Sequence, residues 1–137
     1  DKAPSPEAWN CYLAFQDWKN TTRPVFVHHE LKIISIILEY GGTIDLIEDP
    51  DNLTITDFKS SKAIKPEHKL QLGGYSLLAK EQGYEIRRLR IVRLDKSLGI
   101  YEVWEAQGTE LLEIEHGFMH AKGVYEFFDN EKESLDD

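Results

Sequence analysis

Two acidic residues and one lysine stand in otherwise apolar strand sequences, spaced so that they could act together. Asp57 and Lys59 are two residues apart, so alternation along a strand places both side chains on one face. A three-residue hairpin loop over 50–52, with its proline and Asx turn formers, would pair Asp45 with Asp57 on that face. Opposed carboxylates repel each other, so we expect a divalent cation, Mg²⁺ or Mn²⁺, to hold them. Lys59 would then place positive charge beside a water or a phosphate.

A plainer interpretation of these residues is also open. Asp57 and Lys59 could form a surface ion pair, and Asp45 could simply end a strand. A carboxylate without a partner is costly in an apolar strand, and this cost favours a functional role.

The residue patterns predict a single α/β domain over residues 1–128, followed by an acidic tail over 129–137 that we expect to be disordered. The order α-β-β-β-α-β-β-α is typical of a mixed sheet flanked by helices. Gly73-Gly74 is expected to let the second helix lie close to the sheet. The predicted helices are 5–19, 66–82 and 110–128, and the predicted strands are 25–38, 43–48, 53–59, 86–94 and 100–105.

The composition fits one folded domain and excludes several kinds of site. The chain has 137 residues, 41% of them hydrophobic, and one cysteine. A single cysteine excludes an internal disulfide and a four-cysteine zinc or iron–sulfur site. No apolar run approaches the roughly 20 residues of a membrane span. Because the chain starts at Asp1 rather than Met and shows no signal-peptide pattern, we expect one piece of a longer intracellular polypeptide.

Basic residues gather in the middle of an acidic chain. The net charge is −9, but residues 55–100 contain ten basic and five acidic side chains. If they share a face, these charges would contact several phosphates of a nucleic acid, and Lys62 and Lys65 follow closely on the strand that carries Asp57. The alternative is an ordinary solvated surface of mixed charge.

Three fragments, in order, resemble the PD-(D/E)XK nuclease superfamily, and in particular its RecB-like branch. They are a Gly-x-x-Asp strand over 42–47, an Asp-x-Lys strand over 53–61, and a Gln-x-x-x-Tyr helix with Gln71 and Tyr75. With the order of elements, the resemblance covers roughly residues 5–95. It implies a restriction-endonuclease-like α/β core and metal-dependent hydrolysis of DNA, with an exonuclease favoured.

The resemblance also implies roles for individual residues. Asp45, Asp57 and the backbone carbonyl of Phe58 match the family's ligands for Mg²⁺ or Mn²⁺. Lys59 matches the catalytic lysine, and Gln71 matches the glutamine of the RecB-like branch that lies at the metal and water site.

Other matches leave alternatives open. Tyr75 matches a tyrosine that contacts substrate or supports the site, or else it is a core aromatic beside Leu78. Glu30 is the best match for a supporting glutamate ahead of the Gly-x-x-Asp strand, and Glu39 competes with it.

The chain departs from the branch in its histidines. RecB-like enzymes often carry a histidine in an N-terminal helix, and no histidine precedes His28. His28 and His29 fall on a predicted strand and are interpreted as structural. The histidine-bearing element therefore lies outside this chain, or the protein lacks it.

We expect DNA as the partner, no membrane, and either a homo-oligomer or a larger polypeptide that supplies the missing N-terminal element, in a prokaryotic or phage-like cytoplasmic setting. One rival is a catalytically silent nucleic-acid-binding or scaffold module on the same fold, which should show damage at the acidic and lysine positions. None is seen there. The other rival is a chance assembly of motifs in an unrelated binding domain, which would lack the paired strands of Asp45 and Asp57.

Overall fold

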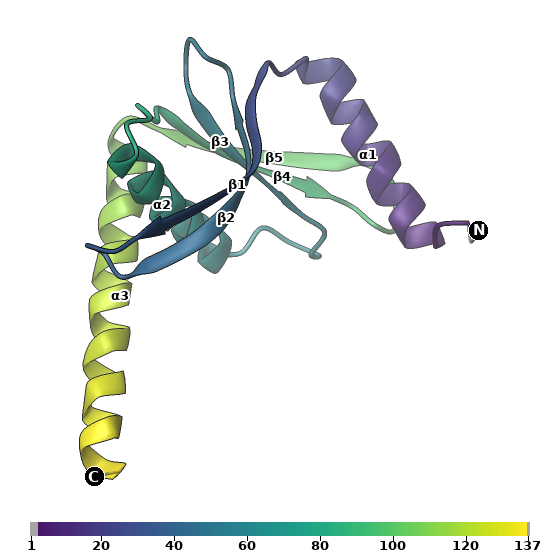
Figure 1. The fold of residues 1–137 in the computed structure, drawn as a ribbon. Coiled ribbons are helices and arrows are strands. Elements are labelled where there is room, and N and C mark those ends of the chain that lie inside the picture. The colour runs from purple at the N-terminus through teal and green to yellow at the C-terminus, as the bar shows by residue number, and fades with distance from the viewer. Residues whose placement is uncertain (1–2, 137) are drawn as a thin grey trace.

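A five-stranded mixed sheet lies between helix α1 on one side and helices α2 and α3 on the other (Figure 1). The structure is a computed structural model that describes residues 3–136. The order of elements and the mixed α/β sheet are those predicted. In chain order the elements are α1 (Pro6–Thr22), β1 (Phe26–Ser35), β2 (Tyr40–Glu48), β3 (Thr54–Lys59), α2 (Pro66–Glu81), β4 (Arg88–Leu94), β5 (Tyr101–Gln107) and α3 (Thr109–Asp136).

The strands are ordered β1-β2-β3-β4-β5, and every neighbouring pair is antiparallel except β3 with β4. A parallel pair needs a crossover connection, which α2 supplies. α2 begins at Pro66, where proline costs no helical hydrogen bond, and is followed by Gly83, whose φ of +97° suits glycine. The crossover sets α2 against the face of the sheet opposite α1.

Both faces of β3 are covered. On the α2 side, Ile55 packs in one hydrophobic cluster with Leu72. On the α1 side, the ring of Phe58 packs against Trp18, with ring centroids 5.3 Å apart. Because side chains alternate along a strand, Asp57 and the lysine two residues further on face α2, as Ile55 does.

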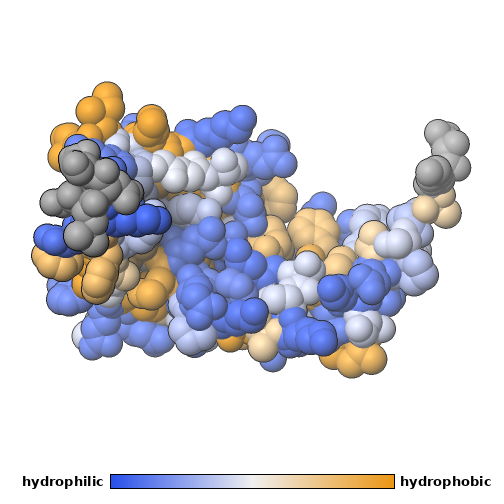
Figure 2. Space-filling view, turned by 90° about the horizontal axis from the view of Figure 1, so that it is seen from below, coloured by the Kyte–Doolittle hydropathy of each residue, from blue (hydrophilic) through white to orange (hydrophobic). Residues whose placement is uncertain are grey.

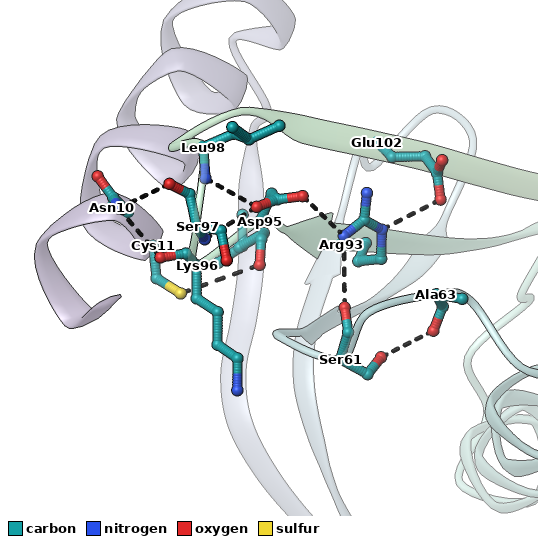
Figure 3. A network of polar contacts seen from close by, with 11 residues as sticks. Asn10, Cys11, Ser61, Ala63, Arg93, Asp95, Lys96, Ser97, Leu98 and Glu102 are labelled. Atoms are coloured by element: carbon teal, nitrogen blue, oxygen red, sulfur yellow. Dashed lines mark hydrogen bonds and ion pairs between the residues drawn. The ribbon is translucent and has the colours of Figure 1, made fainter. Parts of the chain in front are cut away.

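α1 is fixed by polar contacts to the turn between β4 and β5 (Figure 3). Asn10 Nδ2 donates hydrogen bonds to the carbonyl oxygens of Lys96 at 3.0 Å and Ser97 at 3.3 Å. Within the turn, the backbone N–H groups of Leu98 and Ser97 donate to Asp95 Oδ1, and these bonds hold the pKa of Asp95 below its usual value. The turn is therefore structured internally and anchors the N-terminal half of α1.

β1 is shorter than predicted because the chain reverses before β2. The strand ends at Ser35, whose Oγ accepts a hydrogen bond from Leu38 N at 2.8 Å. Ile36 and Ile37 are 88% and 83% exposed in this turn. Their β-branched side chains predicted a strand to residue 38, and that prediction is wrong. The hydrogen bond to Ser35 and the positive φ of Glu39 form a turn instead.

α3 is longer than predicted and extends away from the sheet (Figure 1). It is helical to Asp136 through the segment that we expected to be disordered, and residue 137 lies outside the described residues. The side chains over 123–133 are exposed, Phe127 by 61% and Phe128 by 65%. Figure 2 shows apolar residues gathered around this end of the molecule, at the left of the view. Among the helices described over 3–136, none is both long and apolar enough to cross a bilayer.

Two glycines of α2 allow α3, rather than the sheet, to approach closely. A Cβ atom on Gly73 would lie 2.7 Å from the carbonyl oxygen of Ile114, and one on Gly74 would lie 2.6 Å from the ring of Phe118. The expected close contact of these glycines with the sheet is therefore wrong. The pair sets the packing of α2 on α3.

Candidate active site

Strands β2 and β3 part at the position of the two acids. Their ladder has the predicted register and includes the pair Leu46 and Thr56, so Asp45 and Asp57 are the next residues along. At this point β2 bonds to β3 through a side chain: Asp45 Oδ2 accepts a hydrogen bond from the backbone N–H of Phe58 at 3.0 Å. The carboxyl groups of Asp45 and Asp57 also lie within hydrogen-bonding reach of each other. The two acids are therefore held together where the strands separate.

Asp57 is a buried acid whose charged form is disfavoured by its surroundings. Its side chain is only 6% exposed, and its Oδ2 lies 3.0 Å from Lys59 Nζ. Burial is the main cause that raises the pKa of Asp57 to about 6, and the hydrogen bond and negative charge of Asp45 add to it. The nearby Lys59 ammonium acts in the opposite direction but does not cancel these effects. Asp57 thus has a second carboxylate and a lysine as its charged neighbours, in a mostly buried position.

A chain of hydrogen bonds extends from Lys59 into α2. Lys59 Nζ donates to Gln71 Oε1 at 2.9 Å, and Gln71 Nε2 donates to the hydroxyl of Tyr75, also at 2.9 Å. Residues four apart share a helix face, so α2 presents both side chains to the site. Burial, and then the charges of Asp57 and Asp45, raise the pKa of Tyr75, which keeps its hydroxyl protonated. Both the oxygen and the nitrogen of the Gln71 side-chain amide therefore form hydrogen bonds within the protein.

The structure explains the glycine of the Gly-x-x-Asp strand. The ring of Tyr75 lies against Gly42, where a Cβ atom would be 2.6 Å from Tyr75 Cε1. A larger residue at position 42 would displace the ring and, through it, Gln71. Gly42 therefore supports the position of Lys59 at the far end of the hydrogen-bonded chain.

The donor set at the parted strands suits a small divalent cation. Asp57 Oδ2 is buried, and among the described residues it forms the ion pair with Lys59 Nζ but no contact with hydrogen-bond geometry, which leaves a lone pair for a cation. Mg²⁺ is typically bound by one or two carboxylates with water and phosphate completing its shell, and here two neighbouring carboxylates lie at the backbone of β3, where Asp45 bonds Phe58 N. Among residues 3–136 there is no cluster of three or more His, Cys, Asp or Glu side chains arranged for a metal, so a cage built only from side chains does not fit.

A family model of the PD-(D/E)XK nuclease superfamily matches residues 6–132. The chain belongs to the PD-(D/E)XK nuclease superfamily. Its mixed sheet with flanking helices is consistent with the restriction-endonuclease-like fold of that superfamily. Members are usually nucleases and generally use divalent metal ions, so membership suggests a nuclease here. No curated protein matches the chain.

The other predicted site residues fall at different distances from the superfamily's acids. Glu30 lies in β1 with a φ of +51° and lines the same hollow as Asp45. Glu39 lies in the turn before β2, six residues from Asp45, a separation of about 20 Å along a strand. His28 packs edge-on against the ring of Tyr84. Geometry thus favours Glu30 over Glu39 as the acid beside the site.

Most of the ten basic side chains over residues 55–100 form ion pairs with acidic side chains of the protein itself. Only a few of these charges are left near the site for a nuclease substrate. Lys62 and Lys65 are exposed in the connection between β3 and α2, and neither forms an ion pair with a described side chain. Arg93 Nη1 donates to the carbonyl oxygen of Ser61 and anchors this connection to β4 (Figure 3). The paired residues are Lys80 with Glu115, Arg87 with Glu85, Arg88 with Asp49, Arg90 with Glu48 and Glu105, Arg93 with Asp95 and Glu102, and Lys96 with Glu7.

His68 belongs to the same neighbourhood but was missed by the sequence analysis. Its Nδ1 accepts a hydrogen bond from the backbone N–H of Lys65 at 3.1 Å. Burial and then the charge of Lys59 lower its pKa, with Glu67 opposing the shift and Lys65 adding to it. The signal was available in the spacing, since His68 precedes Gln71 by three residues and so shares its helix face.

Proposed function

We propose that this chain is a RecB-like, metal-dependent deoxyribonuclease that hydrolyses DNA phosphodiester bonds with Mg²⁺ or Mn²⁺, and that it acts as an exonuclease. The main support is the buried position of Asp57 next to Asp45 and Lys59, in which burial first, and then the neighbouring Asp45, raise the pKa of Asp57 to about 6. Like charges in a buried position are costly unless a cation or proton compensates them. A fold serving only as a scaffold has no reason to keep this arrangement.

Asp45, Asp57 and the Phe58 carbonyl would hold the cation. When bound, it would supply Lewis acidity and positive charge at the scissile phosphate. Asp57 must be ionised to bind it, so a pKa of about 6 leaves the site competent at neutral pH. Asp45 has a second task, because its hydrogen bond with Phe58 N fixes the carboxylate against the backbone of β3.

Lys59 would place its ammonium group against the developing negative charge on the phosphate. Asp57 and Gln71 hold its Nζ at 3.0 and 2.9 Å, so the charge is oriented before substrate arrives. Gln71 and Tyr75 act as positioning residues in this arrangement. Gln71 would bind a water only if it released one of its two present partners. Substrate contact by Tyr75 stays a prediction.

Lys62 and Lys65 would bind phosphates that flank the scissile bond. Their connection follows directly on Lys59 and is anchored through Ser61, so a DNA strand crossing the site would pass them. Such an enzyme would act in the cytoplasm on DNA ends. A homo-oligomer or a longer polypeptide would supply any element that the site still needs.

The test is cleavage of matched linear and circular DNA, single- and double-stranded, with Mg²⁺, Mn²⁺ or EDTA. We expect cleavage of linear DNA only, dependent on the metal and abolished by Asp57→Ala. Asp129→Ala, which changes an exposed acid on α3, is the matched control and should cleave as wild type does. Wild-type protein that cleaves no substrate with either metal would replace the proposal with a silent DNA-binding module.

A further inference from the structure

A hollow of about 420 Å³ opens on the α1 side of the sheet, next to the acids. Its walls include three phenylalanine rings from three elements: Phe15 from α1, Phe26 from the start of β1, and Phe58 from β3. The rings of Phe15 and Phe58 meet edge to face, with centroids 5.4 Å apart. This volume is within the range of pockets that bind small organic ligands. The hollow is thus an aromatic site rather than a gap in packing.

The rim of the hollow joins it to the proposed metal site. Asp45 lines the hollow and also contacts Asp57. Phe58 turns its ring toward the hollow, while its neighbours Asp57 and Lys59 face α2. Glu30 adds a second carboxylate to the rim. A group seated among the three rings would lie directly beside a phosphate held at Asp45.

We infer that this hollow binds the unstacked nucleobase of the nucleotide next to the scissile phosphate; this inference rests on the function proposed above. A base has flat π-faces that pack on phenylalanine rings, and aromatic stacking contributes strongly to the binding of single strands. With Asp45 engaged at the metal, the exposed carboxylate of Glu30 accepts hydrogen bonds from the exocyclic amines of adenine, cytosine or guanine, which thymine lacks.

The subsite has a consequence for the substrate. A base inside a duplex is paired and stacked, so it must leave the helix before it can fill the hollow. A frayed or single-stranded end offers that base at little cost. The substrate class is therefore DNA with at least one unpaired nucleotide at the cleavage point.

The test is a binding cycle on short single-stranded oligonucleotides in Ca²⁺, with one abasic position moved along the strand. We expect wild-type affinity to fall about 5- to 100-fold at one position, as stacking energies per base imply. Phe26→Ala should bind weakly whether or not that base is present, because Phe26 is 47% exposed and its loss removes the ring without opening the core. Phe128→Ala, an exposed ring on α3, is the matched control and should keep the wild-type pattern.

A second variant keeps the test sharp if Phe26→Ala unfolds. Glu30→Gln changes an exposed side chain and should lessen the preference for cytosine over thymine at the sensitive position. Equal affinity of wild-type protein for intact and abasic strands, or an unchanged base dependence in Phe26→Ala, would overturn the subsite. Cleavage in Mn²⁺, measured on the same strands, separates the two proposals. Cleavage without base dependence rejects the subsite alone, and base-dependent binding without cleavage rejects the nuclease alone.

Discussion

Two clusters of charge on the sheet each contain two acids and one base, and they differ in arrangement. On the α1 side, Arg90 lies between Glu48 and Glu105 and forms an ion pair with each. On the α2 side, Asp57 lies between Asp45 and Lys59. In the first cluster the base separates the acids. In the second the two acids are neighbours, and the base forms an ion pair with only one of them.

This difference in arrangement distinguishes the structural ion pairs of Arg90 from the candidate active site around Asp57. Glu48 is fully buried, and it forms an ion pair with the guanidinium of Arg90, whose side chain is only 6% exposed. Asp57 is almost as buried, but one of its two charged neighbours is another acid, and burial together with that acid raises its pKa to about 6. A buried acid beside a second acid is therefore a stronger candidate for a functional residue than one that faces a base.

The largest effect is expected when the cluster around Arg90 is broken. Arg90→Met leaves Glu48 buried without its counter-ion and should lower the free energy of unfolding by about 3–5 kcal/mol. The double variant Arg90→Met/Glu48→Met removes both charges and should recover most of that loss. Urea unfolding measures both. A single variant as stable as wild type would show that this cluster contributes nothing to the fold.

Breaking the cluster around Asp57 at its base should affect turnover rather than stability. Lys59→Ala removes the preorganised positive charge but keeps both acids, so turnover should fall about 10²–10³-fold. The Mn²⁺-induced rise in melting temperature should persist. Lys69→Ala is the control and should retain most activity. In the wild type the Lys69 ammonium lies 4.9 Å from the ring centroid of Trp104. Wild-type turnover in Lys59→Ala would favour a silent module.

Neutralising the central acid of the site should stabilise the metal-free protein. The folded-state pKa of Asp57 is raised, so its contribution to stability is complete below its ordinary value of 3.8 and is lost as pH rises through about 6. Asp57→Asn mimics the protonated form. It should therefore match wild type near pH 4 and exceed it by roughly 1–3 kcal/mol at pH 8.

Urea unfolding in EDTA at the two pH values checks this expectation, with Asp51→Asn in the exposed hairpin loop as control. Adding Mn²⁺ at pH 8 should raise the stability of wild type and leave that of Asp57→Asn unchanged. A variant less stable than wild type at pH 8 would mean that Lys59 already balances the two acids.

The smallest effect is expected at the basic residues outside both clusters. Lys62→Ala and Lys65→Ala should each weaken DNA binding modestly, and each should reduce the slope of log affinity against log salt by about 0.7–0.9. Lys132→Ala on the exposed part of α3 should leave the slope unchanged. An unchanged slope in both variants would place the DNA path elsewhere.

The geometry of the site was predictable where it depends on local sequence. The register of β2 and β3 follows from a short loop with turn-forming residues, and alternation then sets which side chains share a face. Gln71 and Tyr75 follow from helical spacing in the same way. The roles of all these residues stay predictions, because geometry alone does not establish chemistry.

Features that depend on distant parts of the chain were not predictable. Glu48 stands in an apolar strand just as Asp45 does, so the sequence signal is the same for a buried ion pair and for a site. What distinguishes them is Arg90, which reaches Glu48 only because β4 pairs in parallel with β3. The ion pairs of the basic side chains over residues 55–100 and the convergence of three phenylalanines have the same origin. The turn at Ser35 was missed for a local reason, since side-chain hydrogen bonds outweighed strand propensity there.

The extended α3 gives the molecule an unusual shape and an uneven resistance to heat. Its 28 residues span about 42 Å, whereas a compact chain of this length has a radius of gyration near 14 Å. The protein should therefore tumble more slowly than a sphere of equal mass. Over 123–133 the exposed turns are held mainly by local pairs such as Lys122 with Glu126, and such pairs stabilise a helix only slightly. On heating, far-ultraviolet circular dichroism should show a gradual loss of helix before the cooperative unfolding of the sheet.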